Sequence, residues 1–188
     1  MGEIKVHEFI TVDGVFEDPS WTVEWWPWDP KMEEAVGALT ASASDILLGR
    51  RTFEMFAPAW STRTAEDDPG APFFNDTPKH VVTSGELAVD WNNSTALGTY
   101  DPESIRSLKA RTEGSIYISG SGQLVRALLA DGLVDELHLF VYPIALGKGQ
   151  RLWGEDGEGA RLALKSSESY TNGIVHLCYG PAAAPGQA

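Results

Sequence analysis

The sequence predicts an α/β fold in which a mixed, mostly parallel sheet carries helices on both faces. Short apolar runs without period-2 alternation, such as residues 116–118, are typical of strands that are buried on both faces. Segments with apolar residues at helical spacing alternate with these runs along the chain. Near the end, two strand-like runs flank Thr171-Asn172-Gly173, a strong hairpin signal. We therefore expect strand–helix units followed by a C-terminal antiparallel hairpin.

Three strands and two helices are expected in the first half of the chain. The strands are predicted at residues 4–11, 45–49 and 79–85. One helix begins at Asp29-Pro30, where Asp is the N-cap and Pro takes the first helical position, and the other begins at Arg50. Residues 15–30 lack a clear period and are expected to be irregular. Residues 57–76, rich in Pro, Asp and Thr, are expected to form a surface connection.

The second half of the chain continues the alternation. Strands are predicted at residues 95–99, 116–118, 134–142, 162–170 and 174–179. Asp101-Pro102 is typical of a helix start, and a further helix is expected after Ser121, its N-cap. No internal repeat is visible, so we expect one domain over residues 1–180 and a disordered tail at 181–188.

The composition excludes several classes of partner. With 14 basic and 27 acidic residues the formal net charge is −13, which argues against binding to nucleic acid or to an anionic membrane. The single cysteine, Cys178, excludes an internal disulfide and a Cys-rich zinc site, and we predict a packed thiol and no metal site. We find no signal-peptide or membrane-spanning pattern and expect a cytoplasmic protein.

The first of two candidate phosphate sites is the junction Gly120-Ser121-Gly122, between a predicted strand and a predicted helix. Free backbone N–H groups at a helix N-terminus, together with the helix dipole, favour an anion. Val125 stands where a Rossmann fingerprint has its third glycine, and the G-K-[ST] of a P-loop is missing. A tight turn without a ligand is the alternative interpretation.

The second candidate is Gly49-Arg50-Arg51-Thr52, which offers two guanidinium groups and a hydroxyl at a predicted helix start. Arginine binds phosphate oxygens in bidentate fashion, and so acidic a chain must concentrate its cations to bind an anion. A pair of surface arginines that solvates a helix start is the alternative. Two such junctions in one sheet suggest a ligand with two anionic groups, such as a dinucleotide. Recognition of a terminal phosphate favours NADPH over NADH.

At this point the motifs resemble those of a known family. Residues 49–54, Gly-Arg-Arg-Thr-Phe-Glu, resemble the G-R-x-T-[FWY]-E motif of dihydrofolate reductase-like proteins. Residues 120–124 with 132–137 are similar to the RibD C-terminal reductase domain of riboflavin biosynthesis, and residues 142–149 resemble its P-x-x-x-G-x-G loop. The motifs occur in family order and the resemblance covers about residues 4–179. It implies a three-layer fold with a sheet of about eight strands, and hydride transfer from NADPH.

The resemblance also implies roles for individual residues. The adenosine phosphate would lie at Gly49, Arg50, Arg51 and Thr52, with Thr83 and Ser84 alongside. The pyrophosphate would lie between Gly120, Ser121, Gly122, Gln123 and Leu124, although some relatives carry a basic residue in place of Gln123. Asp13 and Gly14 would begin the loop that closes over nicotinamide. In many relatives the peptide bond that corresponds to Gly120–Ser121 is cis, and relatives often form homodimers; we expect both here.

Candidate residues for proton transfer and substrate binding are less well defined. Dihydrofolate reductases use an acidic residue on their first helix, and the resemblance, with the spacing to Gly49, implies Glu33 as the nearest match for proton donation. Glu34 and Asp29 are its rivals, and a solvated helix carboxylate is the alternative. A Trp-rich segment forms either a lid over the core or a wall of the substrate pocket, and it suggests Trp25 and Trp26, together with Asp13, as substrate contacts. A phosphate on the substrate could be held by Lys148 and Arg151, and surface charges of the loop are the alternative.

These features predict an NADPH-dependent reductase that acts on a C=N or C=O bond of a small heterocyclic substrate. The specific candidate is reduction of 5-amino-6-(5-phosphoribosylamino)uracil. A dihydrofolate- or pterin-type reductase and a catalytically silent nucleotide-binding module are the alternatives. One cysteine cannot supply the H-x-E and P-C-x-x-C residues of the zinc deaminase that accompanies some RibD reductases.

Overall fold

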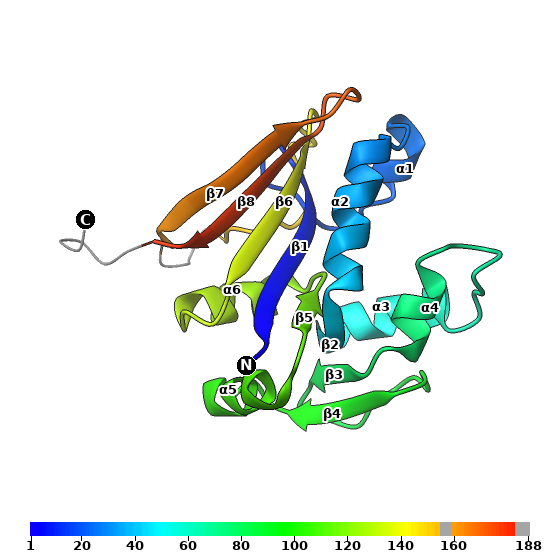
Figure 1. Ribbon diagram of the computed structural model, residues 1–188, viewed down its shortest axis with the longest axis vertical. Helices are drawn as coiled ribbons and strands as arrows, with labels where there is room; N and C mark the ends of the chain where they lie inside the picture. Colours follow the sequence, from blue (N-terminus) through cyan, green and yellow to red (C-terminus); the bar gives the residue numbers. More distant parts are fainter. Residues whose placement is uncertain (155–158, 183–188) are drawn as a thin grey trace.

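Within residues 1–154 and 159–182, which the computed structural model describes apart from the side chains of Val23 and Trp25, eight strands form one sheet. Their order across the sheet is β4-β3-β2-β5-β1-β6-β8-β7 (Figure 1). The strands are β1 (Glu3–Thr11), β2 (Ala43–Gly49), β3 (Lys79–Val82), β4 (Ser94–Gly98), β5 (Ser115–Ile118), β6 (Glu136–Tyr142), β7 (Leu162–Ser169) and β8 (Val175–Pro181). The helices are α1 (Trp21–Trp25), α2 (Pro30–Ala41), α3 (Arg50–Trp60), α4 (Ala71–Asp76), α5 (Pro102–Arg111) and α6 (Gly122–Ala130).

The sheet is mixed, as the sequence predicts. The six strands from β4 to β6 run parallel to one another. Strand β8 pairs antiparallel with both β6 and β7, which confirms the predicted C-terminal hairpin. Because β1, β2 and β5 are parallel neighbours, the loops that follow them emerge at the same edge of the sheet.

Two apolar cores lie on opposite faces of the sheet. Helices cover both faces, which confirms the three-layer arrangement (Figure 1). Helices α5 and α6 cover one face, where Ile105 and Val125 pack against Ile4 and Val6 of β1. Helices α2, α3 and α4 cover the other face, where Phe53 packs in a largely aromatic core. In the described part of the chain, no helix has the length and apolar content to cross a membrane.

Two aspartate caps begin helices where the sequence predicts them. Asp29 accepts hydrogen bonds from the N–H groups of the first turn of α2, and Asp101 does the same for α5. Asp29 also accepts the N–H of Thr171, at 2.9 Å, and the hydroxyl of the same residue. These bonds hold the N-terminus of α2 against the β7–β8 turn and lower the pKa of Asp29. A local capping signal thus also fixes a tertiary contact.

The predictions for two segments without periodicity were wrong. The irregular segment at 15–30 contains α1, and the surface connection at 57–76 contains the end of α3 and all of α4. Packing explains the second case, because the ring of Phe74 stacks on that of Trp60 with centroids 4.3 Å apart. Most of the predicted tail lies outside the described residues, and within them Pro181 ends β8.

Lys79, the first residue of β3, is a fully buried cation that closes the C-terminus of α4. Its Nζ donates hydrogen bonds to the carbonyl oxygens of Phe74, at 2.7 Å, and of Thr77, at 2.8 Å. The ammonium group also lies over the ring of Trp91, 4.6 Å from its centroid. The charge is therefore compensated by carbonyl dipoles and an aromatic face.

We predict that Lys79→Met destabilises the fold by about 2–4 kcal/mol, because the carbonyl oxygens that it serves would remain buried without a donor. Urea denaturation followed by tryptophan fluorescence measures this loss. The control is Lys148→Met, at an exposed lysine in the loop after β6, which we expect to change stability by less than about 0.5 kcal/mol. Equal stability of the two variants would show that the α4 carbonyls do not need this donor.

Candidate functional site

A cavity of about 350 Å³ opens at the edge of the sheet where β1, β2 and β5 end. Segments from four parts of the chain line it: the end of β1 and its loop, the start of α3, the β5–α6 turn, and residues near 150. The lining is largely apolar near Phe9, Phe16 and Phe56, and it is polar along the β5–α6 turn. The position matches the rule that parallel α/β sheets bind ligands outside the carboxyl ends of their strands.

The two predicted phosphate junctions interlock at the floor of this cavity. A Cβ atom on Gly49 would lie only 2.3 Å from Oγ of Ser121, and one on Gly120 would lie 3.0 Å from Oγ1 of Thr52. Gly120 also has a φ of +69°, which favours glycine, and the predicted cis bond between Gly120 and Ser121 is present. Ser121 occupies the N-cap position of α6 without a side-chain capping bond. The two junctions therefore form one continuous surface.

Six of the predicted cofactor residues line the cavity: Arg51, Thr52, Gly120, Ser121, Gly122 and Gln123. The other five lie at the same edge but outside the lining: Gly49, Arg50, Thr83, Ser84 and Leu124. Leu124 belongs to the apolar core, and Arg50 is exposed and pairs with Glu54 at 3.6 Å. Thr83 is buried, and its Oγ1 accepts the N–H of Gly85. Of the two arginines in the motif, only Arg51 borders the cavity.

Three guanidinium groups border the cavity, although the chain is strongly acidic. Arg51 pairs with Glu17 at 3.1 Å, and Arg126 donates to the carbonyl oxygen of Leu152 at 2.9 Å. Arg151 donates from Nε to the carbonyl oxygen of Asp13, also at 2.9 Å. Sequence reasoning missed Arg126; its position one helical turn after Gly122, at i+4, is the signal that could have found it. These cations make the rim of the cavity suitable for an anionic ligand.

Asp13 is a positioning residue outside the cavity lining. Its carboxylate accepts the hydroxyl of Thr11 at 2.6 Å and the N–H of Gly147 at 2.8 Å. These hydrogen bonds lower the pKa of Asp13 to about 2, so the carboxylate stays charged. Through these bonds, Asp13 ties the loop after β1 to the loop after β6 and to Arg151. The expected direct contact between Asp13 and the substrate stays a prediction.

The Trp-rich segment packs over the aromatic core beside the cavity. The ring of Trp26 meets Tyr142 edge-on, with centroids 5.5 Å apart, and Trp26 is not part of the lining. Trp28 is half exposed, and its ring centroid lies 6.2 Å from that of Phe9. Phe9 does line the cavity. The side chain of Trp25 lies outside the described residues. The segment thus covers the core and reaches the cavity through Phe9.

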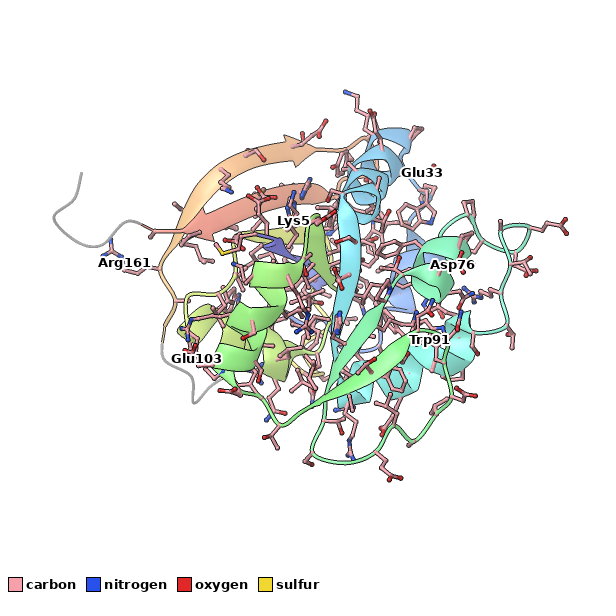
Figure 2. All side chains as sticks on the ribbon, turned by 60° about the horizontal axis from the view of Figure 1, so that its bottom comes forward. Lys5, Glu33, Asp76, Trp91, Glu103 and Arg161 are labelled. Atoms are coloured by element: carbon pink, nitrogen blue, oxygen red, sulfur yellow. The ribbon has the colours of Figure 1, made fainter. Side chains whose placement is uncertain are left out.

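Glu33 and Glu8 differ sharply in their surroundings. Glu33 is exposed on α2 and does not line the cavity (Figure 2). Glu8, in the central strand β1, is only 4% exposed, lines the cavity and accepts the N–H of Gly120 at 3.0 Å. Burial raises the pKa of Glu8 to about 8, although the Gly120 hydrogen bond opposes the rise. Sequence reasoning missed Glu8; the available signal was an acidic residue inside the predicted strand at residues 4–11.

The family model of the RibD C-terminal domain matches residues 3–176. The chain belongs to this family. The uncharacterized protein YyaP of Bacillus subtilis is similar, with 23% identity over 173 residues that cover 90% of each chain.

Solved structures share the RibD C-terminal fold. A protein from Shewanella sp. PV-4 assigned to riboflavin biosynthesis has a TM-score of 0.78 at 19% identity, over 97% of this chain and all of the other. Dihydrofolate reductase from Enterococcus faecalis, complexed with NADP(H), has a TM-score of 0.59 at 14% identity, over 95% of this chain and 96% of the other. These similarities confirm the predicted dihydrofolate reductase-like fold.

Glu8 has a testable effect on stability. The folded protein keeps its proton to about pH 8, whereas an unfolded chain releases it near pH 4.5. The contribution of the Glu8 carboxyl group to the free energy of unfolding is therefore complete below pH 4.5. It falls as the pH rises toward 8. We predict that Glu8→Gln gains stability relative to the wild type across this interval, by up to about 1.4 kcal/mol per pH unit.

Urea denaturation at several pH values in this interval measures the difference. Glu33→Gln, at an exposed carboxylate, is the control and should run parallel to the wild type. A constant difference between Glu8→Gln and the wild type at every pH would contradict the raised pKa of Glu8.

Proposed function

We propose that the chain is an NADPH-dependent reductase whose cofactor binds in the cavity at the carboxyl edge of the sheet. The observation that carries this proposal is the convergence of two helix N-termini and three guanidinium groups on one cavity of an acidic chain. The fold shared with an NADP(H)-bound dihydrofolate reductase supports it. When bound, NADPH supplies the hydride.

The two junctions would divide the recognition of the cofactor between them. Arg51 and Thr52, at the start of α3, offer a guanidinium and a hydroxyl for a terminal phosphate. The turn from Gly120 to Gln123 offers backbone N–H groups at the start of α6 for the pyrophosphate. Because Arg51 pairs with Glu17 at 3.1 Å, a phosphate would have to replace this carboxylate.

Glu8 is our candidate for the proton donor. When a hydride adds to the carbon of a C=N or C=O bond, the nitrogen or oxygen must take up a proton. The raised pKa of Glu8 keeps its carboxyl group protonated at neutral pH, and the group lines the cavity. The Gly120 N–H holds one carboxyl oxygen in place. Glu33 has neither the burial nor the position for this role.

The lining favours a flat heterocyclic substrate. Phe9, Phe16 and Phe56 offer aromatic surface, and Arg151 offers a cation for a substrate phosphate. The uracil intermediate of riboflavin biosynthesis has both features, and the similarity to the Shewanella protein is in line with this choice. Lys148 is not part of the lining, which leaves Arg151 as the better candidate of the pair. A pterin substrate, the alternative, would not need the contact between Arg151 and a substrate phosphate.

We predict that the protein prefers NADPH to NADH and that Arg51→Ala removes the preference. Loss of a charge-assisted contact with the terminal phosphate should weaken NADPH binding by about 10–100-fold and leave NADH binding nearly unchanged. Titration of the tryptophan fluorescence measures both affinities. Arg106→Ala, on α5, is the control and should behave like the wild type. Absence of NADPH binding in the wild type would overturn the proposal.

A second prediction concerns catalysis by Glu8. We expect Glu8→Gln to lower kcat by about 100-fold or more, with NADPH affinity within a few-fold, because the amide cannot donate the proton. NADPH oxidation with a panel of pyrimidines and pterins, followed against pH, measures the effect. The wild-type rate should fall as Glu8 loses its proton near pH 8.

The outcomes of the catalytic experiment separate the alternatives. Glu33→Gln is the matched control, and its kcat should equal that of the wild type. If Glu33→Gln loses activity and Glu8→Gln keeps it, Glu8 is not the donor. NADPH binding without turnover of any substrate would instead favour a catalytically silent binding module.

A further inference from the structure

A second cluster of reactive side chains lies away from the cavity, on β6 and β8. Glu136 and His138 are two residues apart on β6, so their side chains lie on the same face of the sheet. His138 is paired with Cys178 of β8 in the antiparallel register. His138 and Cys178 are 8% and 5% exposed. Glu136 is the first residue of β6, so the cluster lies toward the edge opposite the cavity. The proposed reductase activity uses none of these groups.

The distances among the three side chains are close to those of a metal site. Nε2 of His138 lies 3.2 Å from Oε2 of Glu136 and 3.8 Å from Sγ of Cys178, and the three atoms all lie within 4.8 Å of one another. A tetrahedral ion with bonds of about 2.0–2.3 Å separates its ligand atoms by about 3.3–3.7 Å. One ion could therefore contact all three groups after small side-chain movements.

The surroundings of His138 fix its ring in the orientation that a ligand needs. Nδ1 of His138 lies 2.9 Å from Nε2 of His176, whose Nδ1 lies 3.3 Å from the hydroxyl of Tyr170. The His176 ring also stacks on Phe140, with centroids 4.2 Å apart and planes 6° from parallel. If each ring donates from Nδ1 along this chain, Nε2 of His138 presents its lone pair to the ion. Metal-binding histidines commonly have such a partner on their other nitrogen.

Two lysines form ion pairs with the carboxylate of Glu136 and would have to be accommodated when a metal ion binds. Nζ of Lys165 lies 2.9 Å from Oε1 of Glu136 and can stay there, because the ion needs the other oxygen. Nζ of Lys5 lies 3.4 Å from Oε2 and would have to move away (Figure 2). Glu3, 3.6 Å from the same ammonium group, is an alternative partner. Binding thus requires one partly exposed side chain to change partner.

We propose that Glu136, His138 and Cys178 form a binding site for Zn²⁺ that links β6 to β8. Thiolate, imidazole and carboxylate together are typical of zinc, and three protein ligands leave the fourth position for water. On binding, the Cys178 thiol releases its proton to solvent, and Glu136 and neutral His138 coordinate directly. The sequence predicts no metal site because no set of ligands is close together along the chain. Here strand pairing brings together His138 and Cys178, which lie 40 residues apart.

Titration of the full chain with Co²⁺ tests this site, because cobalt reports thiolate coordination by a charge-transfer band in the near ultraviolet. Cys178 is the single cysteine, so the band can come from no other thiol. We expect saturation at one equivalent, displacement by Zn²⁺, and loss of the band in Cys178→Ser and in His138→Gln. His176→Gln should weaken binding by about 10–100-fold without abolishing the band.

The control is His80→Gln. Nε2 of His80 forms a similar pair with Oδ1 of Asp45, at 2.7 Å. Neither residue belongs to the set of three candidate ligands, so the variant should bind Co²⁺ like the wild type. A thermal unfolding midpoint that rises with Zn²⁺ in the wild type but not in Cys178→Ser would support the site independently. Absence of the band in folded wild-type protein, or its persistence in His138→Gln, would overturn the proposal.

Discussion

The close approach of two strand–helix junctions determines the geometry of the candidate site. Strands β2 and β5 are neighbours, so the turns that follow them meet at one edge. Gly49 has no room for a Cβ atom beside Ser121, and Gly120 has little beside Thr52. Larger side chains at these glycines would separate the helix N-termini, and the backbone N–H groups would no longer face one cavity. The absence of two side chains therefore lets both helix N-termini face one cavity.

The β5–α6 turn also contacts Glu8. The N–H of Gly120, in the β5–α6 turn, donates to a carboxyl group that emerges from the centre of the sheet. Burial of a carboxylate is costly, and a single N–H offsets only part of that cost, so the pKa of Glu8 stays raised. The junction thus connects the proposed phosphate-binding surface to the candidate acid. A change in the turn should affect both the position and the protonation of Glu8.

Local signals made much of the fold predictable, and tertiary packing limited the rest. The caps at Asp29 and Asp101 and the Gly49 motif depend on a few adjacent residues, so the sequence alone identifies them. Helix α4 has a different origin, since it is stabilised by aromatic packing against Trp60 and by Lys79 from the next strand. The role of Glu8 likewise depends on a partner 112 residues away. Such contacts leave no periodic pattern in the sequence.

The charge balance around the cavity bears on the proposal that so acidic a chain binds an anion. Arg51, Arg126 and Arg151 each have a partner within the protein: a carboxylate, a carbonyl oxygen and the Asp13 backbone, respectively. These partners orient the guanidinium groups before a ligand arrives, which lowers the entropic cost of binding. Glu17 has the opposite effect as well, because its charge competes with a phosphate for Arg51. The affinity of the proposed site for a phosphate therefore depends on how much more strongly Arg51 binds the phosphate than the Glu17 carboxylate. It does not depend on the number of cations alone.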